Sequence, residues 1–108
     1  MNRLLVEPTL EREIHGFAEA IRRRMPARQI WLFGSVARGE ATEDSDVDLL
    51  VVLPDNHGIE RPCLTAKLAI GETKTCVPTD VVVITESQAA LPASPLIEDA
   101  LREGRLLK

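Results

Sequence analysis

The segment of residues 30–53 constrains the fold more than any other part of this 108-residue chain, and it reads IWLFGSVARGEATEDSDVDLLVVL. An apolar run ends at Gly34 and Ser35, and after a polar connection Asp46 and Asp48 stand at the head of a second apolar run. One intervening residue places both aspartates on the same face of a strand, with Cα atoms about 7 Å apart. Two like charges beside a hydrophobic run repel each other and resist burial unless a cation lies between them. The spacing therefore predicts a metal site.

Hydrophobic periodicity and breaker residues predict a series of helices and strands. A first helix is expected over residues 8–25, ended by Pro26, and a strand follows over 29–33, whose unbroken apolar character predicts cover on both faces. The other expected elements are a short helix beginning at 36–38 and stopped by Gly39, a strand at 47–53, a helix at 62–70, a strand at 80–84, a helical turn at 86–90 and a helix at 96–103. In the helix at 62–70, we expect Leu64, Leu68 and Ala69 to point inward.

The positions of the polar and acidic residues also predict the sheet topology. If Ser35 at the end of the first strand is to face Asp46 at the beginning of the second, those strands must be antiparallel. Asp80 opens the third strand, and it can join Asp46 and Asp48 only if the second and third strands are parallel. Parallel neighbours need a crossover of about a dozen residues or more, and residues 54–79 supply one. We therefore expect an α/β (α+β) fold, with a small mixed sheet flanked by helices and three carboxylates at one edge.

Composition limits the number of domains and the class of partner. A chain of 108 residues is expected to form one domain, residues 1–108, around a single core. The net charge of -4 argues against a broad nucleic-acid surface, because phosphate backbones are bound by clustered Lys and Arg. We find no apolar leader and no membrane-spanning run, so the chain is expected to stay in the cytosol. In that reducing compartment Cys63 and Cys76 would be free thiols.

Three aspartates beside a Gly-Ser turn meet the electrostatic needs of nucleotidyl transfer. Carboxylate oxygens select a hard cation such as Mg2+, which shares its coordination shell with substrate phosphates. Two ions about 4 Å apart can lower the pKa of an attacking hydroxyl and neutralise a leaving pyrophosphate. In this scheme Asp46 and Asp48 bridge the ions, and Asp80 completes the site that activates the nucleophile and accepts its proton. Gly34 lets the backbone approach a phosphate, and Ser35 offers that phosphate a hydroxyl and an N–H.

The same residues carry a resemblance to a known family. The segment from Gly34 to Asp48 has the pattern GS-x10-DxD, and TDVVVIT contains a third aspartate at Asp80. Over nearly its whole length the chain resembles the minimal nucleotidyltransferases (MNT) of the DNA polymerase beta superfamily, which are commonly encoded beside HEPN-domain toxins. The resemblance implies a nucleotidyltransferase fold with three or four strands, ATP as substrate with Mg2+, and an antitoxin that transfers AMP to a tyrosine of the toxin. It also implies that Arg38 lies near the nucleotide phosphates.

These residues also have simpler structural interpretations, except Asp48, because an aspartate inside a strand is unfavourable by propensity and burial. Gly34 and Ser35 can form a tight turn with a serine cap, Asp46 can close a loop, Asp80 can be a strand-entry residue, and Arg38 can pair with Glu40 or Glu43.

Three functions fit these features. The first is an active enzyme that modifies a protein partner. The second is a non-catalytic antitoxin that masks its toxin through apolar residues of the tail, namely Leu96, Ile97, Leu101, Leu106 and Leu107. The third is a small-molecule nucleotidyltransferase whose cleft is completed by a second copy of the chain or by another polypeptide.

Overall fold

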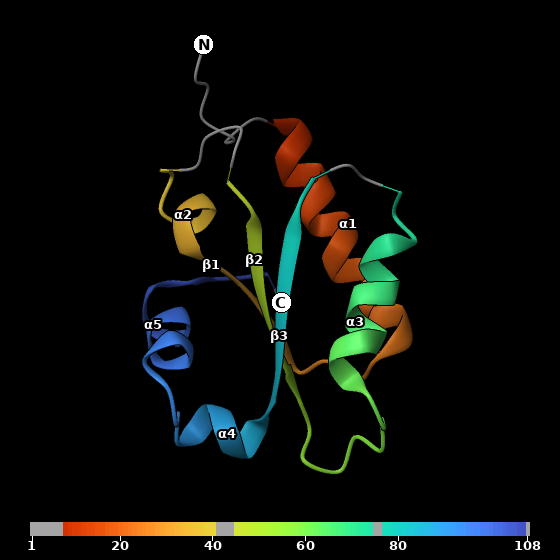
Figure 1. The fold of residues 1–108 in the computed structure, drawn as a ribbon, viewed down its shortest axis with the longest axis vertical. Coiled ribbons are helices and arrows are strands. Elements are labelled where there is room, and N and C mark those ends of the chain that lie inside the picture. Colours follow the sequence, from red (N-terminus) through yellow and green to blue (C-terminus); the bar gives the residue numbers. More distant parts are fainter. Residues whose placement is uncertain (1–7, 41–44, 75–76, 108) are drawn as a thin grey trace.

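The computed structural model describes residues 8–40, 45–74 and 77–107, drawn in colour in Figure 1. Its elements are, in chain order, α1 (Pro8–Arg24), β1 (Gln29–Phe33), α2 (Gly34–Ala37), β2 (Val47–Leu53), α3 (Pro62–Gly71), β3 (Thr79–Thr85), α4 (Glu86–Ala90), α5 (Pro95–Glu103) and β4 (Arg105–Leu106). None of the helices in these ranges has the length and apolar character that crossing a membrane requires. Cys63 is an exposed free thiol, whereas Cys76 and Glu43 lie outside the described residues.

The four strands form one mixed sheet in the order β3-β2-β1-β4. β1 and β2 are antiparallel, with Ile30 opposite Val51, and β2 and β3 are parallel, with Val51 beside Val83. Both orientations are those predicted from the placement of the aspartates. The two-residue strand β4 adds an antiparallel edge to β1, with Trp31 opposite Leu106.

Alternate residues of β2 enter two different apolar layers, as the period of a strand requires. Leu49, Val51 and their neighbours pack with α1 and α3 on one face of the sheet. Leu50 and Val52 pack on the other face, where α4 and α5 lie (Figure 1). Ile30 and Leu32 of β1 are buried in the first layer, and Trp31 and Phe33 are partly buried in the second, so β1 is covered on both faces, as predicted.

The inner face of α3 differs from the prediction. Ala66, Ala69 and Ile70 are buried, whereas Leu64 and Leu68 are 47% and 56% exposed. The expectation that both leucines point inward is therefore wrong, although Ala69 does face the core. Apolar residues surround nearly the whole of this helix, so periodicity cannot select a face, and the two alanines allow a closer approach to the sheet than leucines would.

Gly104 allows the chain to return from α5 to the sheet edge. A Cβ at this position would lie 2.3 Å from the carbonyl oxygen of Ala100 and 2.9 Å from that of Leu32. We expect Gly104→Ala to lower the free energy of unfolding by about 1–3 kcal/mol, because backbone must shift to make room. Urea unfolding measures this loss. Gly16→Ala on α1 is the matched control, since nothing lies within 4 Å of its new Cβ and alanine favours the helix; a loss of the same size there would contradict the steric argument.

Candidate active site

Asp48 and Asp80 lie side by side on neighbouring strands. The parallel register of β2 and β3 pairs them directly, and adjacent strands are about 4.8 Å apart. Because side chains alternate along a strand, Asp48 lies on the same face as Leu50, which packs in the layer of α4 and α5. The topology thus brings two of the three predicted carboxylates together at one end of the sheet.

Asp46 lies one residue before β2, which begins at Val47 as predicted. It is exposed, whereas Asp48 is partly buried. Burial is the largest cause that raises the pKa of Asp48 above its usual value, and the negative charges of Asp80 and Asp46 raise this pKa further. The positive charge of Arg38 acts in the opposite direction. The anionic form of Asp48 is therefore disfavoured at this position.

Gly34 lies in close contact with the Asp48 carboxylate. Its φ of +78° belongs to the left-handed region, and a Cβ built on it would lie 2.3 Å from Oδ2 of Asp48. The preceding residue, Phe33, is paired with Asp48 in the β1-β2 register. Gly34 is thus required by backbone conformation and by close approach of the carboxylate, a steric role that its sequence context did not reveal.

Ser35 and Arg38 lie on and just after α2. The carbonyl oxygen of Ser35 accepts a hydrogen bond from the backbone N–H of Glu40 at 2.9 Å. The Arg38 guanidinium donates from Nε to Oε1 of Glu40 at 2.6 Å. The ion pair considered from sequence is therefore present in the structure. Arg38 nevertheless borders the same hollow as Gly34 and Asp48, whereas Ser35 is not among the described residues that border the hollows around Asp48.

Two hollows meet at Asp48. One has a volume of about 220 Å³ and is bordered by Phe33, Gly34, Arg38, Asp48, Leu96, Asp99, Ala100 and Glu103; we call it the arginine hollow. The other, of about 340 Å³, is bordered by Phe33, Asp48, Asp80, Val81, Val82 and Leu96; we call it the edge hollow, because β3 is the outermost strand. Phe33, Asp48 and Leu96 border both hollows.

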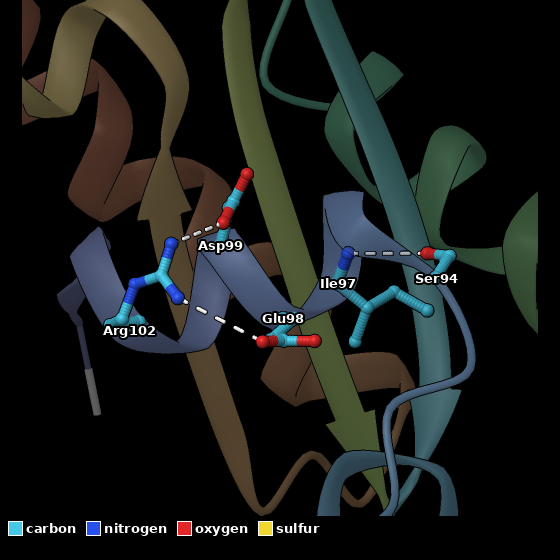
Figure 2. A network of polar contacts seen from close by, with 5 residues as sticks. All are labelled: Ser94, Ile97, Glu98, Asp99 and Arg102. Carbon is cyan, nitrogen blue, oxygen red and sulfur yellow. Dashed lines mark hydrogen bonds and ion pairs between the residues drawn. The ribbon is translucent and has the colours of Figure 1, made fainter.

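Helix α5 contributes residues to this site that sequence reasoning did not assign to it. Leu96 was noted only as an apolar tail residue, and Asp99 and Glu103 were not singled out. Asp99 and Glu103 are four residues apart and so share one side of the helix, a spacing that could have indicated a polar side turned toward the site. Figure 2 shows how this helix is held: Ser94 Oγ accepts from the Ile97 N–H at 3.3 Å, and Arg102 donates to Asp99 at 2.6 Å.

The carboxylates fit a hard divalent cation by their chemistry. In the parts of the chain that the structure describes, no three His, Cys, Asp or Glu side chains converge closely enough to form a complete metal site. Asp48 and Asp80 are register partners, and Asp46 is close enough for its charge to raise the pKa of Asp48. Their oxygens are ligands of the kind that Mg2+ prefers, and a cation would relieve their mutual repulsion.

Sequence relatives align with this chain over short segments. The protein adenylyltransferase MntA of Thermococcus cleftensis is 44% identical over 48 residues, which cover 44% of this chain and 48% of that protein. A protein of Methanocaldococcus jannaschii, provisionally described as a protein adenylyltransferase, is 46% identical over 44 residues, covering 39% of this chain and 44% of the relative. The matched segments thus span about half the length of these relatives.

A solved structure and a family profile extend further along the chain. The crystal structure of a Sulfolobus solfataricus protein, provisionally described as a nucleotidyltransferase, superposes with a TM-score of 0.56 at 19% identity, covering 88% of this chain and 76% of the other. At that identity the likeness shows a shared fold alone. The profile of the nucleotidyltransferase domain matches residues 14–107, a range that includes Gly34, Asp48 and Asp80. The chain therefore belongs to the nucleotidyltransferase domain family.

Proposed function

We propose that this protein transfers AMP from ATP to a hydroxyl group of a protein partner, with Mg2+, and that the partner is a HEPN-domain toxin that the transfer neutralises. One observation carries the proposal: Asp48 and Asp80 are register partners on parallel strands, and the Asp48 carboxylate lies against Gly34. Membership of the nucleotidyltransferase domain family supports the reaction class. The name of the Thermococcus relative, a protein adenylyltransferase, supports a protein acceptor.

Each residue has a task in this proposal. Asp46, Asp48 and Asp80 would hold Mg2+, which when bound neutralises phosphate charge and lowers the pKa of the attacking hydroxyl. The hydroxyl oxygen forms a bond to the α-phosphorus of ATP, the bond to the bridging oxygen breaks, and pyrophosphate leaves with that electron pair. Asp80 accepts the hydroxyl proton, and Arg38, released from Glu40, neutralises phosphate charge. Because Gly34 has no Cβ, it leaves room for the Asp48 carboxylate in this position.

A second function, a non-catalytic antitoxin, is favoured by a different observation. Leu96 and Leu106 are 53% and 46% exposed, so each presents apolar surface that a partner could cover. In that case the toxin is neutralised by masking, and the carboxylates are not used. Mg2+-dependent binding of ATP, measured by calorimetry, separates the two functions, because a masking antitoxin needs no nucleotide. The third function, transfer to a small molecule, would appear as transfer to low-molecular-weight acceptors with the partner left unlabelled.

The proposed reaction is tested by incubating the protein with Mg2+, ATP labelled at the α-phosphate and the product of the adjacent reading frame, the expected HEPN toxin. We expect label on a tyrosine of the toxin. Asp46→Asn and Asp80→Asn should each reduce labelling by at least about 100-fold, because one acidic ligand and one negative charge are lost where phosphate charge is neutralised.

Glu19→Gln is the control for this experiment, since it removes one negative charge from an exposed position on α1, away from the two hollows. Its labelling should equal that of the wild type. If the wild type labels nothing, and both aspartate variants still neutralise the toxin, the enzymatic proposal is wrong and the masking function stands.

A further inference from the structure

The two hollows beside Asp48 differ in whether a cation of the protein borders them. The arginine hollow is bordered by Arg38, a cation that can approach phosphate oxygens, and by Asp48, Asp99 and Glu103, of which Asp99 is paired with Arg102. None of the described residues bordering the edge hollow is a cation, and its charged residues are Asp48 and Asp80. In the edge hollow only a bound cation could offset the repulsion between a triphosphate and the two carboxylates. Because Arg38 can approach phosphate oxygens in the arginine hollow, we assign the nucleotide phosphates to that side of Asp48, which leaves the edge hollow for an uncharged group that reaches Asp80.

The remaining wall of the edge hollow is apolar. Phe33, Val81, Val82 and Leu96 border it, and Phe33 and Val82 are partly buried in the layer of α4 and α5. Apolar walls with a few polar groups are typical of sites that bind the body of a ligand by hydrophobic contact and orient it by its polar end. The polar end here is the carboxylate pair of Asp48 and Asp80.

Leu96 is not among the residues of α5 that pack in the apolar layer of the sheet. It is 53% exposed in the first turn of the helix, whereas Ile97, Ala100 and Leu101 belong to that layer. The cap formed by Ser94, drawn in Figure 2, fixes the turn that carries Leu96. The helix thus presents an apolar side chain at the junction of the two hollows, where it borders both.

We infer that Leu96 is a specificity-determining residue. It completes an apolar binding surface in the edge hollow for an acceptor whose hydroxyl is attached to an apolar group, such as a phenol. It also limits the access of water. The inference rests on the proposed function. In the favoured reaction, the phenolic oxygen bonds to the α-phosphorus, pyrophosphate leaves, and Asp80 takes the proton. In the competing reaction a water oxygen makes the same attack, and free AMP is released.

The competing products test the inference within one reaction mixture. The full chain is incubated with Mg2+, ATP labelled at the α-phosphate and N-acetyl-tyrosinamide, and the ratio of phenolic AMP ester to free AMP is measured. We expect Leu96→Ser to lower this ratio about tenfold, because the variant loses apolar contact with the ring and admits water. Leu68→Ser on α3 is the matched control, since Leu68 has a similar exposure of 56% and is not among the residues bordering either hollow. An unchanged ratio in Leu96→Ser, or an equal fall in Leu68→Ser, would overturn the inference.

A binding measurement keeps the inference separate from the proposed function. If the wild type forms neither product, methyl NMR with 4-methylphenol as probe decides the inference alone, and labelling of the toxin decides the proposed transferase activity. We expect saturable shifts of the Leu96 and Val82 methyl signals, which glycerol, a hydroxyl compound without an apolar ring, does not produce. Shifts of equal size at Leu64 and Leu68, or no shift at Leu96, would overturn it.

Discussion

Asp48→Asn is expected to raise the Tm of the metal-free protein while abolishing nucleotidyl transfer. Burial and the neighbouring charges of Asp80 and Asp46 raise the pKa of Asp48, so its anion destabilises the folded state at neutral pH. Asparagine has nearly the same shape without the charge. We expect a gain of a few degrees, since about 1 kcal/mol corresponds to roughly 4–8 °C in a domain of this size. A functional residue that costs stability is common in binding and catalytic sites.

The difference in Tm between the two proteins should depend on pH, because the pKa of Asp48 is raised in the folded state. Asp48 favours folding while it is protonated, and that contribution is lost as the pH rises through its raised pKa in the folded state. The wild type and Asp48→Asn should therefore have similar Tm values below pH 3.8, the ordinary pKa of an aspartate, and should diverge above it. Calorimetric scans from pH 3 to pH 8 measure the difference. A variant that is less stable than the wild type at pH 7 would contradict the argument.

Added Mg2+ and ATP should make the wild type more stable than Asp48→Asn, which reverses the order of the two Tm values. A ligand that binds only the folded state raises stability by RT ln(1 + [L]/Kd), which is about 2.7 kcal/mol when the concentration is 100 times Kd. The wild type should gain this increment in Mg2+ and ATP, whereas Asp48→Asn should gain little. Equal stabilisation of both proteins would show that Asp48 is not a ligand.

Gly34→Ala is expected to remove activity and stability together. The new Cβ would lie 2.3 Å from Oδ2 of Asp48, so the carboxylate must move, and the left-handed backbone disfavours alanine by about 1–2 kcal/mol. A displacement of about 1 Å in a catalytic group can reduce the rate about 100-fold. We therefore expect a loss of transfer of about that size, measured at a temperature at which circular dichroism shows the variant to be folded.

Gly58→Ala separates the backbone cost of alanine in the left-handed region from the displacement of the Asp48 carboxylate, which Gly34→Ala combines. Gly58 has a similar φ of +72°, and nothing lies within 4 Å of its Cβ position, so alanine there meets the backbone cost without displacing a carboxylate. Both variants should lose stability, and only Gly34→Ala should lose transfer and the increment from Mg2+. Full activity in a folded Gly34→Ala would show that the position of Asp48 tolerates the new side chain.

The sequence predicted the strands well where hydrophobic runs end at strong breakers. The range 29–33 agrees with β1, and 47–53 agrees with β2, because Pro26, the Gly34–Ser35 pair and Pro54 punctuate them. The orientation of the strands followed from chemistry, since carboxylates that act together must lie at one edge of the sheet. The parallel pairing of β2 with β3 confirms the predicted orientation of these strands. The roles of Asp46, Asp48, Asp80, Ser35 and Arg38 stay predictions until they are tested.

Other features depend on tertiary contacts that have no local signal. The buried face of α3 is set by how closely its alanines approach the sheet, and a helix apolar on most sides does not encode that choice. The contact of Gly34 with Asp48 arises because β1 and β2 pair, which places Asp48 opposite Phe33, the residue before Gly34. Leu96 reaches the site because α5 folds back across the sheet, and its spacing along the chain is compatible with core packing or with solvent.

The outermost position of β3 affects how large the acceptor can be. Among the described residues β2 is the only strand that pairs with β3, so Asp80 is carried on the rim of the sheet. In the proposed reaction, Asp80 on this rim can be reached by a side chain that projects from a folded protein. A small, freely diffusing acceptor would stay partly in solvent there, so the proposed reaction should be faster with an acceptor on a folded protein than with a small phenol.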